Sequence, residues 1–398
     1  MTTVDATPLH AIQESAGAGF IGYGSPDDHV EVVDSFGAYE AEYAALRKGV
    51  GVLDMPQRGL IEVRGSDRLT FLQAMVTNDT SAESLGSASR GGGSEGGSGG
   101  GGCRAFLLNK KGRIDADLIA FEHDGVCYLD LDRCDVATVV KELDKYLFTE
   151  DAQLEDVSAK VYHLALHGPE ATALVERIGS ESVTGLEPGQ CSQVTIDGAE
   201  CRLYRRDQLA APGYHLWTAI EAAAGIYQRI AGELGGLVPD VEGGARRDLA
   251  GRGVGWLAYN TARIEAGAPL YHIDFGPDSL PHETGVLDET VSFTKGCYLG
   301  QEIVARMHNL GHARRTLVGI KIDDERLPIA GSQVLDAQDG ATVIGAVTSS
   351  TLSPLLGNCA IGFAMIKWGR HRPNTNVLIP AEGEMVRAVT QGLRFVGE

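Results

Sequence analysis

Apolar residues recur at helical spacing in several stretches of the chain. The clearest stretch begins at Val136 and ends at Leu147, with apolar positions at i, i+3, i+4, i+7, i+10 and i+11, and it predicts an amphipathic helix. Weaker patterns of the same kind predict helices near residues 38–50, after the potential capping residue Asp67, and over 169–178 and 219–234.

Short apolar runs between the predicted helices indicate strands, at 60–64, 105–108, 117–121, 126–131, 162–166 and 214–217. The pattern changes at about Thr316, where short alternating runs separated by turn residues begin, at 317–322, 343–347 and 359–364. Such spacing is typical of a small antiparallel barrel. The pattern predicts an α+β fold with a C-terminal β domain.

Two segments show neither pattern. Residues 1–38 are polar and predict an irregular N-terminal extension. Residues 91–102, almost all glycine, lack side chains to bury and predict a flexible loop inserted within one domain. The letters of residues 17–22 match G-x-G-x-x-G, but no strand is predicted before them, so we do not expect a dinucleotide site there.

Composition and charge narrow the possible partners. The 398 residues are 43% hydrophobic, which suits two or three domains. The formal net charge of −20 disfavours nucleic acid and anionic membrane surfaces as main partners. No apolar run approaches the roughly 20 residues that span a bilayer, and the N-terminus does not resemble a secretory signal. Seven cysteines without a C-x-x-C pair argue against a disulfide framework and a zinc ribbon, so we expect reduced thiols and a cytoplasmic protein.

Three sets of motifs give the chain a family resemblance. They are G-V-L-D at 51–54 with T-N-D at 77–79 and L-L-N-K-K-G-R-I at 107–114; L-A-L-H-G-P-E-A at 164–171; and A-R-I-E-A-G-A-P-L-Y at 262–271, followed by K-G-C-Y-L-G-Q-E at 295–302. In this order they resemble the YgfZ/GcvT family, which includes YgfZ and the glycine cleavage T-protein, an aminomethyltransferase. The segment at 295–302 favours the YgfZ branch. The resemblance implies three domains in a ring around a central cavity that holds tetrahydrofolate. It places an N-terminal extension at 1–38, a folate-binding region of two α/β subdomains at 39–312, and a β-barrel at 313–398.

Glu265 is the strongest candidate for binding the pterin of folate. A pterin edge presents two parallel donors, and one carboxylate offers two acceptors at matching spacing. The resemblance gives this role to the Glu of R-x-E-A-G, here Arg263 to Gly267. It also implies cofactor contacts for the remaining candidates, Arg263, Asn78, Asp79, Tyr259, Gln301 and Arg306. The structural alternatives are a solvated or salt-bridged helix residue for Glu265, a turn and cap role for Asn78 and Asp79, and a solvated face for Arg306 with its neighbours Arg314 and Arg315.

Cys297 is the candidate for sulfur or metal chemistry. The nearby Lys295 would favour the reactive thiolate form, and the glycines at 296 and 300 permit unusual backbone angles. In the YgfZ branch this cysteine is the hallmark, associated with maintenance of iron–sulfur proteins. One cysteine cannot hold a cluster, so a shared iron–sulfur cluster would need ligands from a partner. The alternative is a small buried apolar residue. His308 and His312 have i, i+4 spacing but no evident third ligand, so no metal site is expected.

One position departs from the T-protein pattern. T-proteins carry an essential acid in G-G-x-x-D-D-L-I, and alignment on Leu118 puts Ala116 at that place. Alanine has no proton to transfer, so acid–base catalysis cannot come from this residue. Asp115 is offset by one residue, which in a strand turns the side chain to the opposite face unless a bulge restores it. Whether the chain is an enzyme stays open at this point.

Three functions follow from these observations. The first is a tetrahydrofolate-binding protein of the YgfZ type that supports iron–sulfur protein assembly or repair, with iron–sulfur assembly or client proteins as partners. The alternative is a folate-dependent one-carbon transferase of the aminomethyltransferase type. The least favoured is a scaffold that keeps the fold without folate.

Overall fold

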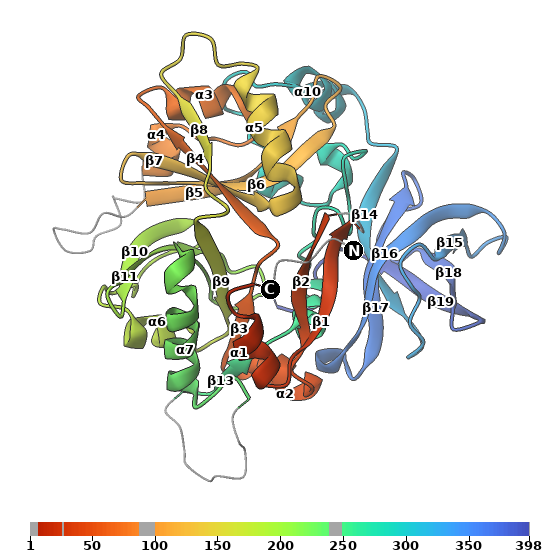
Figure 1. Cartoon of the computed structure of the whole chain (residues 1–398). Coiled ribbons are helices and arrows are strands. Elements are labelled where there is room, and N and C mark those ends of the chain that lie inside the picture. Colours follow the sequence, from red (N-terminus) through yellow and green to blue (C-terminus); the bar gives the residue numbers. More distant parts are fainter. Residues whose placement is uncertain (1–6, 26–27, 87–99, 239–248, 398) are drawn as a thin grey trace. The chain divides into compact units, whose positions relative to one another are not determined.

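The computed structural model describes residues 7–25, 28–86, 100–238 and 249–397 (Figure 1). The chain divides into two compact units. The first comprises Met1–Met75, Asp79–Arg104 and Leu118–Tyr259, and the second comprises Val76–Asn78, Ala105–Asp117 and Asn260–Glu398. The predicted boundary between residues 312 and 313 falls inside the second unit.

The described part of the N-terminal segment is not the irregular extension that the sequence indicated. It contains a short helix, α1 (His10–Ser15), and an antiparallel hairpin of β1 (Gly19–Ser25) and β2 (Asp28–Ser35). Three glycines in β1 weaken the apolar alternation by which strands are recognised. Pairing with β2 therefore specifies the strand, and two glycines of the G-x-G-x-x-G letters lie within it.

The first unit is built largely on one mixed sheet. Its strand order is β13-β3-β9-β12-β11-β10-β5-β6-β7-β4-β8. Most of its neighbouring strands run antiparallel, whereas β13 and β3 pair in parallel. The bounds are β3 (Val50–Asp54), β4 (Arg58–Arg64), β5 (Gly100–Leu108), β6 (Ile114–His123), β7 (Val126–Asp132), β8 (Gln153–Asp156), β9 (Val161–His167), β10 (Gln190–Ile196), β11 (Ala199–Arg205), β12 (Gly213–Ala219) and β13 (Gly251–Gly253). The predicted strands at 60–64, 126–131, 162–166 and 214–217 are confirmed.

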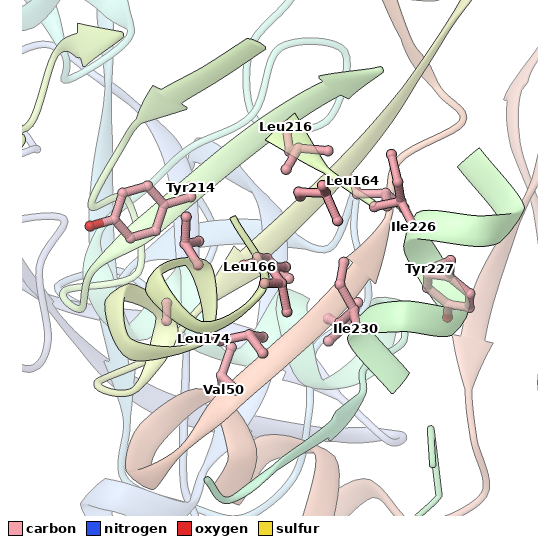
Figure 2. Close-up of a cluster of buried hydrophobic side chains, with 14 of the residues drawn as sticks. Val50, Leu164, Leu166, Leu174, Tyr214, Leu216, Ile226, Tyr227 and Ile230 are labelled. Atoms are coloured by element: carbon pink, nitrogen blue, oxygen red, sulfur yellow. The ribbon is translucent and has the colours of Figure 1, made fainter. Parts of the chain in front are cut away.

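Helices pack against this sheet. They are α2 (Tyr39–Lys48), α3 (Arg68–Met75), α4 (Ala82–Gly86), α5 (Val136–Asp144), α6 (Ala171–Ile178) and α7 (Ala223–Leu234). Of these, α5, α6 and α7 have strongly amphipathic sequences. Figure 2 shows side chains of α6 and α7 meeting those of β3, β9 and β12 in the main core, with Leu174 and Ile230 among the helix contributions and Val50, Leu166 and Leu216 among the strand contributions. The predicted helices in these regions are confirmed, because the apolar stripes that define them are the faces that the sheet buries.

The end of the glycine-rich segment is structured. The predicted flexible insert spans 91–102, of which 91–99 lie outside the described residues. Gly100, Gly101 and Gly102 begin β5, and Gly100 pairs with Cys191 of β10. A Cβ at Gly100 would stand 1.7 Å from the Glu122 carbonyl oxygen. The prediction of a loop is therefore wrong for these three residues, because their missing side chains allow a close approach of strands.

The second unit carries a closed antiparallel barrel, as the alternating pattern predicted. The strands run in the order β14-β17-β16-β15-β18-β19. Their bounds are β14 (Arg315–Ile322), β15 (Gln333–Asp336), β16 (Val343–Ser353), β17 (Cys359–Lys367), β18 (Asn376–Ala381) and β19 (Glu384–Gln391). Aliphatic side chains from every strand fill the interior, among them Ile320, Val334, Ile366 and Ile379. The overall class is therefore a mixed α/β fold with a C-terminal β-barrel.

Three helices precede the barrel in sequence: α8 (Trp256–Ala266), which passes from the first unit into the second, α9 (Leu287–Thr290) and α10 (Gln301–Leu310). Across the described ranges, no helix combines the length and the apolar character that crossing a bilayer requires.

Candidate functional site

The end of α8 positions the R-x-E-A-G motif. Gly267 follows the helix with φ of +77°, a left-handed conformation that favours glycine. A Cβ at this residue would stand 2.8 Å from the main-chain nitrogen of Arg394. The carbonyl oxygen of Glu265 accepts hydrogen bonds from the main-chain N–H groups of Phe395 at 2.9 Å and Val396 at 3.1 Å. The helix end is therefore locked against the segment that follows the last barrel strand.

The carboxylate of Glu265 is fully buried, with 0% exposure. The hydroxyl of Ser353, at the end of β16, donates a hydrogen bond to its Oε1 atom. A buried carboxylate is costly unless hydrogen-bond donors surround it. The solvated alternative for Glu265 is therefore excluded, and the site holds a carboxylate in a fixed orientation.

Arg263 has a different environment from the one the resemblance implied. Its side chain is 1% exposed and forms an ion pair with Asp274, with 2.7 Å between Nη1 and Oδ2. Nε donates to the Asn260 side chain at 2.9 Å, Nη2 donates to the Ser349 hydroxyl at 2.8 Å, and Nη1 also donates to the Ala268 carbonyl at 3.3 Å. Protein groups thus take up most of the five guanidinium N–H donors. This arrangement favours a positioning role, two residues before Glu265, over direct contact with a ligand.

Asp115 and Ala116 lie on β6, where burial alternates residue by residue. Ile114, Ala116 and Leu118 are buried, whereas Asp115 and Asp117 are half-buried. This alternation puts the Asp115 side chain on the opposite face from Ala116. The Asp115 carboxylate accepts a hydrogen bond from the Asn109 amide at 2.8 Å. Asp117 shares its face, and the sequence reasoning overlooked this pairing, which the i, i+2 spacing in D-A-D signals.

Cys297 is exposed, so the alternative of a buried apolar residue is wrong. The Lys295 ammonium donates to the main-chain carbonyls of Val76 and Asn78, both at 2.7 Å, and lies 5.3 Å from the centre of the Tyr298 ring. These contacts anchor the segment before α10 to the T-N-D turn. They do not support activation of Cys297 by Lys295.

Asn78 and Asp79 make different kinds of contact. Asn78 donates through Nδ2 to the carbonyl of Glu289, which lies in α9, at 2.9 Å. Asp79 Oδ1 accepts from the Gln73 amide at 2.9 Å and from the main-chain N–H of Ser81 at 3.0 Å, just before α4. The Asp79 contacts are of the turn and cap kind that the sequence left open as an alternative, whereas Asn78 makes a contact with a residue distant in the sequence.

The remaining candidates are dispersed. Tyr259 is buried in the first unit, and its hydroxyl accepts a hydrogen bond from the Gln208 amide at 3.1 Å. Gln301 is half-buried at the start of α10. Arg306 is exposed and lines a depression of about 450 Å³ with Met307 and Leu310.

The other arginines and histidines in and after α10 make contacts with protein groups or line a surface depression. Arg315 forms an ion pair with Glu283 at 3.1 Å, whereas Arg314 lines a neighbouring depression of about 400 Å³ with Lys111. His308 stacks on Phe293 at 3.9 Å between ring centres. His312 stacks on Trp368 at 4.8 Å.

Sequence reasoning missed the groups that hold Arg263 and Glu265 in place. Ser353 and Asp274 come from segments that are distant from α8 or irregular, and no periodicity marks them. The only signal is the polar run T-S-S-T-L-S at 348–353, which is unusually rich in hydroxyls for a barrel strand.

Known proteins resemble the chain over its whole length. Residues 9–295 match the GCVT N-terminal domain, and residues 315–396 match the glycine cleavage T-protein C-terminal barrel domain. Aminomethyltransferases of Bacillus mycoides and Bacillus cereus are each 27% identical over 393 residues, covering 98% of this chain and 97% of theirs. The crystal structure of glycine cleavage system aminomethyltransferase T from Bartonella henselae has a TM-score of 0.82, with 22% identity and coverage of 99% and 98% of the two chains.

Proposed function

Because the chain belongs to the glycine cleavage T-protein family, we propose that it is a tetrahydrofolate-binding protein that acts as a one-carbon transferase of the aminomethyltransferase type. The relatives called aminomethyltransferases match it nearly end to end. They support this function, which was the alternative interpretation of the sequence, more strongly than an iron–sulfur role. The proposal places the protein in the cytoplasm, where its free cysteines would stay reduced.

The buried carboxylate of Glu265 carries the proposal. Its burial excludes water that would compete for its oxygens, and Ser353 restricts its rotation. A pterin edge, with its amino group and adjacent ring N–H, suits such an acceptor because two charge-assisted hydrogen bonds can form in parallel. The residues at the end of α8 therefore fit the cofactor that the family implies.

The chain's own residues would bind and orient the cofactor. Bound tetrahydrofolate would supply the nitrogen that carries the one-carbon group. Glu265 would fix the orientation of the pterin, and the Arg263–Asp274 pair would hold the helix end that presents it. Ala116 is fully buried and moves no proton. Any proton transfer by β6 would have to use the opposite face, where Asp115 and Asp117 lie.

The test is a calorimetric titration of reduced protein with tetrahydrofolate. Glu265→Gln keeps the shape but loses the charge, and we expect it to weaken binding about 10- to 100-fold. Glu384→Gln, the same substitution at an exposed position of β19, is the matched control and should bind as the parent does. Absence of binding by the parent protein would defeat the proposal and favour the scaffold without folate.

Turnover is the second part of the test. The protein would be supplied with tetrahydrofolate and a panel of aminomethyl and methyl donors, including a lipoyl-carried aminomethyl group. Formation of methylene-tetrahydrofolate supports the transferase. Tight folate binding without product from any donor would remove the transferase step and leave a folate-binding protein.

A YgfZ-type role in iron–sulfur protein maintenance is the second candidate, because Cys297 is exposed within K-G-C-Y-L-G-Q-E. An exposed thiol is available to a partner that supplies further ligands. In a deletion strain with defective iron–sulfur enzymes, the parent gene should restore activity and Cys297→Ala should not. Full restoration by Cys297→Ala would remove this candidate.

A further inference from the structure

A compact group of side chains lies in the first unit, whereas the R-x-E-A-G motif belongs to the second. It comprises Asp130 on β7, His163 on β9 and His215 on β12. One donor atom from each residue lies within 4.8 Å of the others. His163 Nε2 and His215 Nδ1 are 3.0 Å apart and share a hydrogen bond, which an ion bound between them would replace. Two imidazole nitrogens bound to one metal ion at about 2.0–2.1 Å each would lie about this close.

The curvature of the sheet creates this group. β9 and β12 are neighbours, but β11, β10, β5 and β6 separate them from β7 in the strand order. Asp130 nevertheless reaches the histidines. A shared apolar cluster contains Tyr128 of β7 and Trp217 of β12, which shows that the two parts of the sheet fold toward each other. Trp217 also stacks on the His163 ring at 4.2 Å between centres, which fixes the plane of that ring.

The group is shielded from solvent. The exposed fractions of Asp130, His163 and His215 are 2%, 1% and 3%, so water is largely excluded from their donor atoms.

Several ring nitrogens in this group lack hydrogen-bond partners among the described residues. They are Nδ1 of His163, Nε2 of His215 and both nitrogens of His167, whose ring lies edge-on to His215 at 5.4 Å. None of these atoms is the His163 Nε2 or the His215 Nδ1 that an ion at this group would bind, so ion binding would leave their environment unchanged.

Arg58 is the competing charge. Its Nη2 lies 2.7 Å from Asp130 Oδ1, and its Nε donates to the same oxygen at 2.8 Å. A cation must therefore share the Asp130 carboxylate with Arg58. Because of this competition, removing the charge of Arg58 should strengthen metal binding.

We propose that Asp130, His163 and His215 form a binding site for a divalent first-row transition-metal ion that holds the two parts of the curved sheet together. Two imidazoles and one carboxylate match the donor preference of zinc, cobalt and iron(II) rather than that of magnesium or calcium. Because the ligands come from three strands, the bound ion would act as a cross-link in the folded state alone.

The test uses the full chain, made metal-free by dialysis against a chelator. It is titrated with Co²⁺, followed by visible absorption, and with Zn²⁺, followed by calorimetry. We expect one equivalent of each ion to bind and Zn²⁺ to raise the melting temperature, whereas Mg²⁺ does neither. Absence of Co²⁺ and Zn²⁺ binding by the parent chain would overturn the proposal and leave the cluster as a hydrogen-bonding network.

Variants separate this site from adventitious surface binding. Asp130→Asn and His215→Gln should each weaken Kd at least about tenfold. Arg58→Gln should tighten Kd several-fold, because it removes the competing cation, a result that a purely structural Arg58 would not produce. His371→Ala in the barrel is the control and should leave Kd unchanged. Unaltered affinity in both ligand variants would contradict the site, and if they fail to fold, the parent and Arg58→Gln titrations decide.

Discussion

Arg263 and Asp274 form a fully enclosed ion pair, with exposed fractions of 1% and 0% and 2.7 Å between Nη1 and Oδ2. Asp274 also accepts hydrogen bonds from the hydroxyls of Thr348 and Ser349 and from the main-chain N–H of Leu270. The pair thus joins α8 to β16 and to the loop that follows α8. It holds the helix end from which Glu265 projects.

Removal of either charge of the Arg263–Asp274 pair should therefore destabilise the folded protein. In Asp274→Asn the Arg263 charge stays buried without its counter-charge, and we expect the free energy of unfolding to fall by about 3 to 5 kcal/mol. Urea denaturation measures this loss. Asp278→Asn, at a side chain that is 93% exposed, is the control and should change stability by less than about 0.5 kcal/mol. Equal stability of the two variants would show that the pair contributes little.

Asp54 should make stability depend on pH. Burial raises the pKa of this carboxyl to about 6, partly offset by the hydrogen bond that the Gln13 amide donates at 2.7 Å. The titratable groups that face it are the hydroxyls of Tyr162 and Tyr227, whose pKa values burial also raises, so both stay neutral.

The sign follows from the direction of the shift. The folded protein favours the neutral acid, so this contribution to stability is complete below the unfolded pKa, near 4, and is lost as pH rises through about 6. The loss is on the order of 3 kcal/mol. Urea unfolding between pH 4 and pH 7.5 should show this slope in the parent relative to Asp54→Asn. Parallel pH profiles for the two proteins would contradict the shift.

Gly102 should tolerate no side chain. A Cβ there would stand 2.7 Å from the Ala120 carbonyl oxygen and 2.8 Å from both Phe121 and Tyr204. We expect Gly102→Ala to destabilise the protein by about 1 to 3 kcal/mol, measured by thermal unfolding.

The control for this variant is Gly225→Ala in α7, where a Cβ has open space. Helix propensity should there raise stability by about 0.5 to 1 kcal/mol. Opposite signs for the two substitutions are the expected result. A neutral Gly102→Ala would show that β5 does not approach its neighbours as closely as described.

Cys297 should react first with a thiol reagent. Cys297 and Cys134 are exposed, whereas the remaining cysteines are buried or half-buried. Partial burial and the carboxylates of Asp132 and Asp135 raise the pKa of the Cys134 thiol, which slows its reaction because the thiolate is the nucleophile. Ellman's reagent should therefore give a fast phase that Cys297→Ser removes and Cys134→Ser leaves. A fast phase that survives Cys297→Ser would refute this order.

Local patterns in the sequence were enough to predict the elements whose stability depends on such patterns. The apolar stripe from Val136 predicted α5, and the alternation after Thr316 predicted the barrel, because such faces must be buried whatever covers them. The motif at 263–267 also identified Glu265 as the main candidate for binding the pterin. The sequence also predicted that Asp115 and Ala116 point to opposite faces of a strand, and the alternating burial of residues 114–118 agrees with this. This prediction was possible because the two-residue period of a strand is a local property.

Contacts between residues that are distant in the sequence could be identified only in the folded chain. Ser353 meets Glu265 from 88 residues away, and Ser349 meets Arg263 from 86 residues away. The three glycines of β5 and the hairpin of β1 and β2 become strands only through their neighbours. Asp130 meets His163 and His215 only because the sheet curves. No periodicity encodes such contacts, because they arise from the packing of whole elements rather than from the conformation of any one of them.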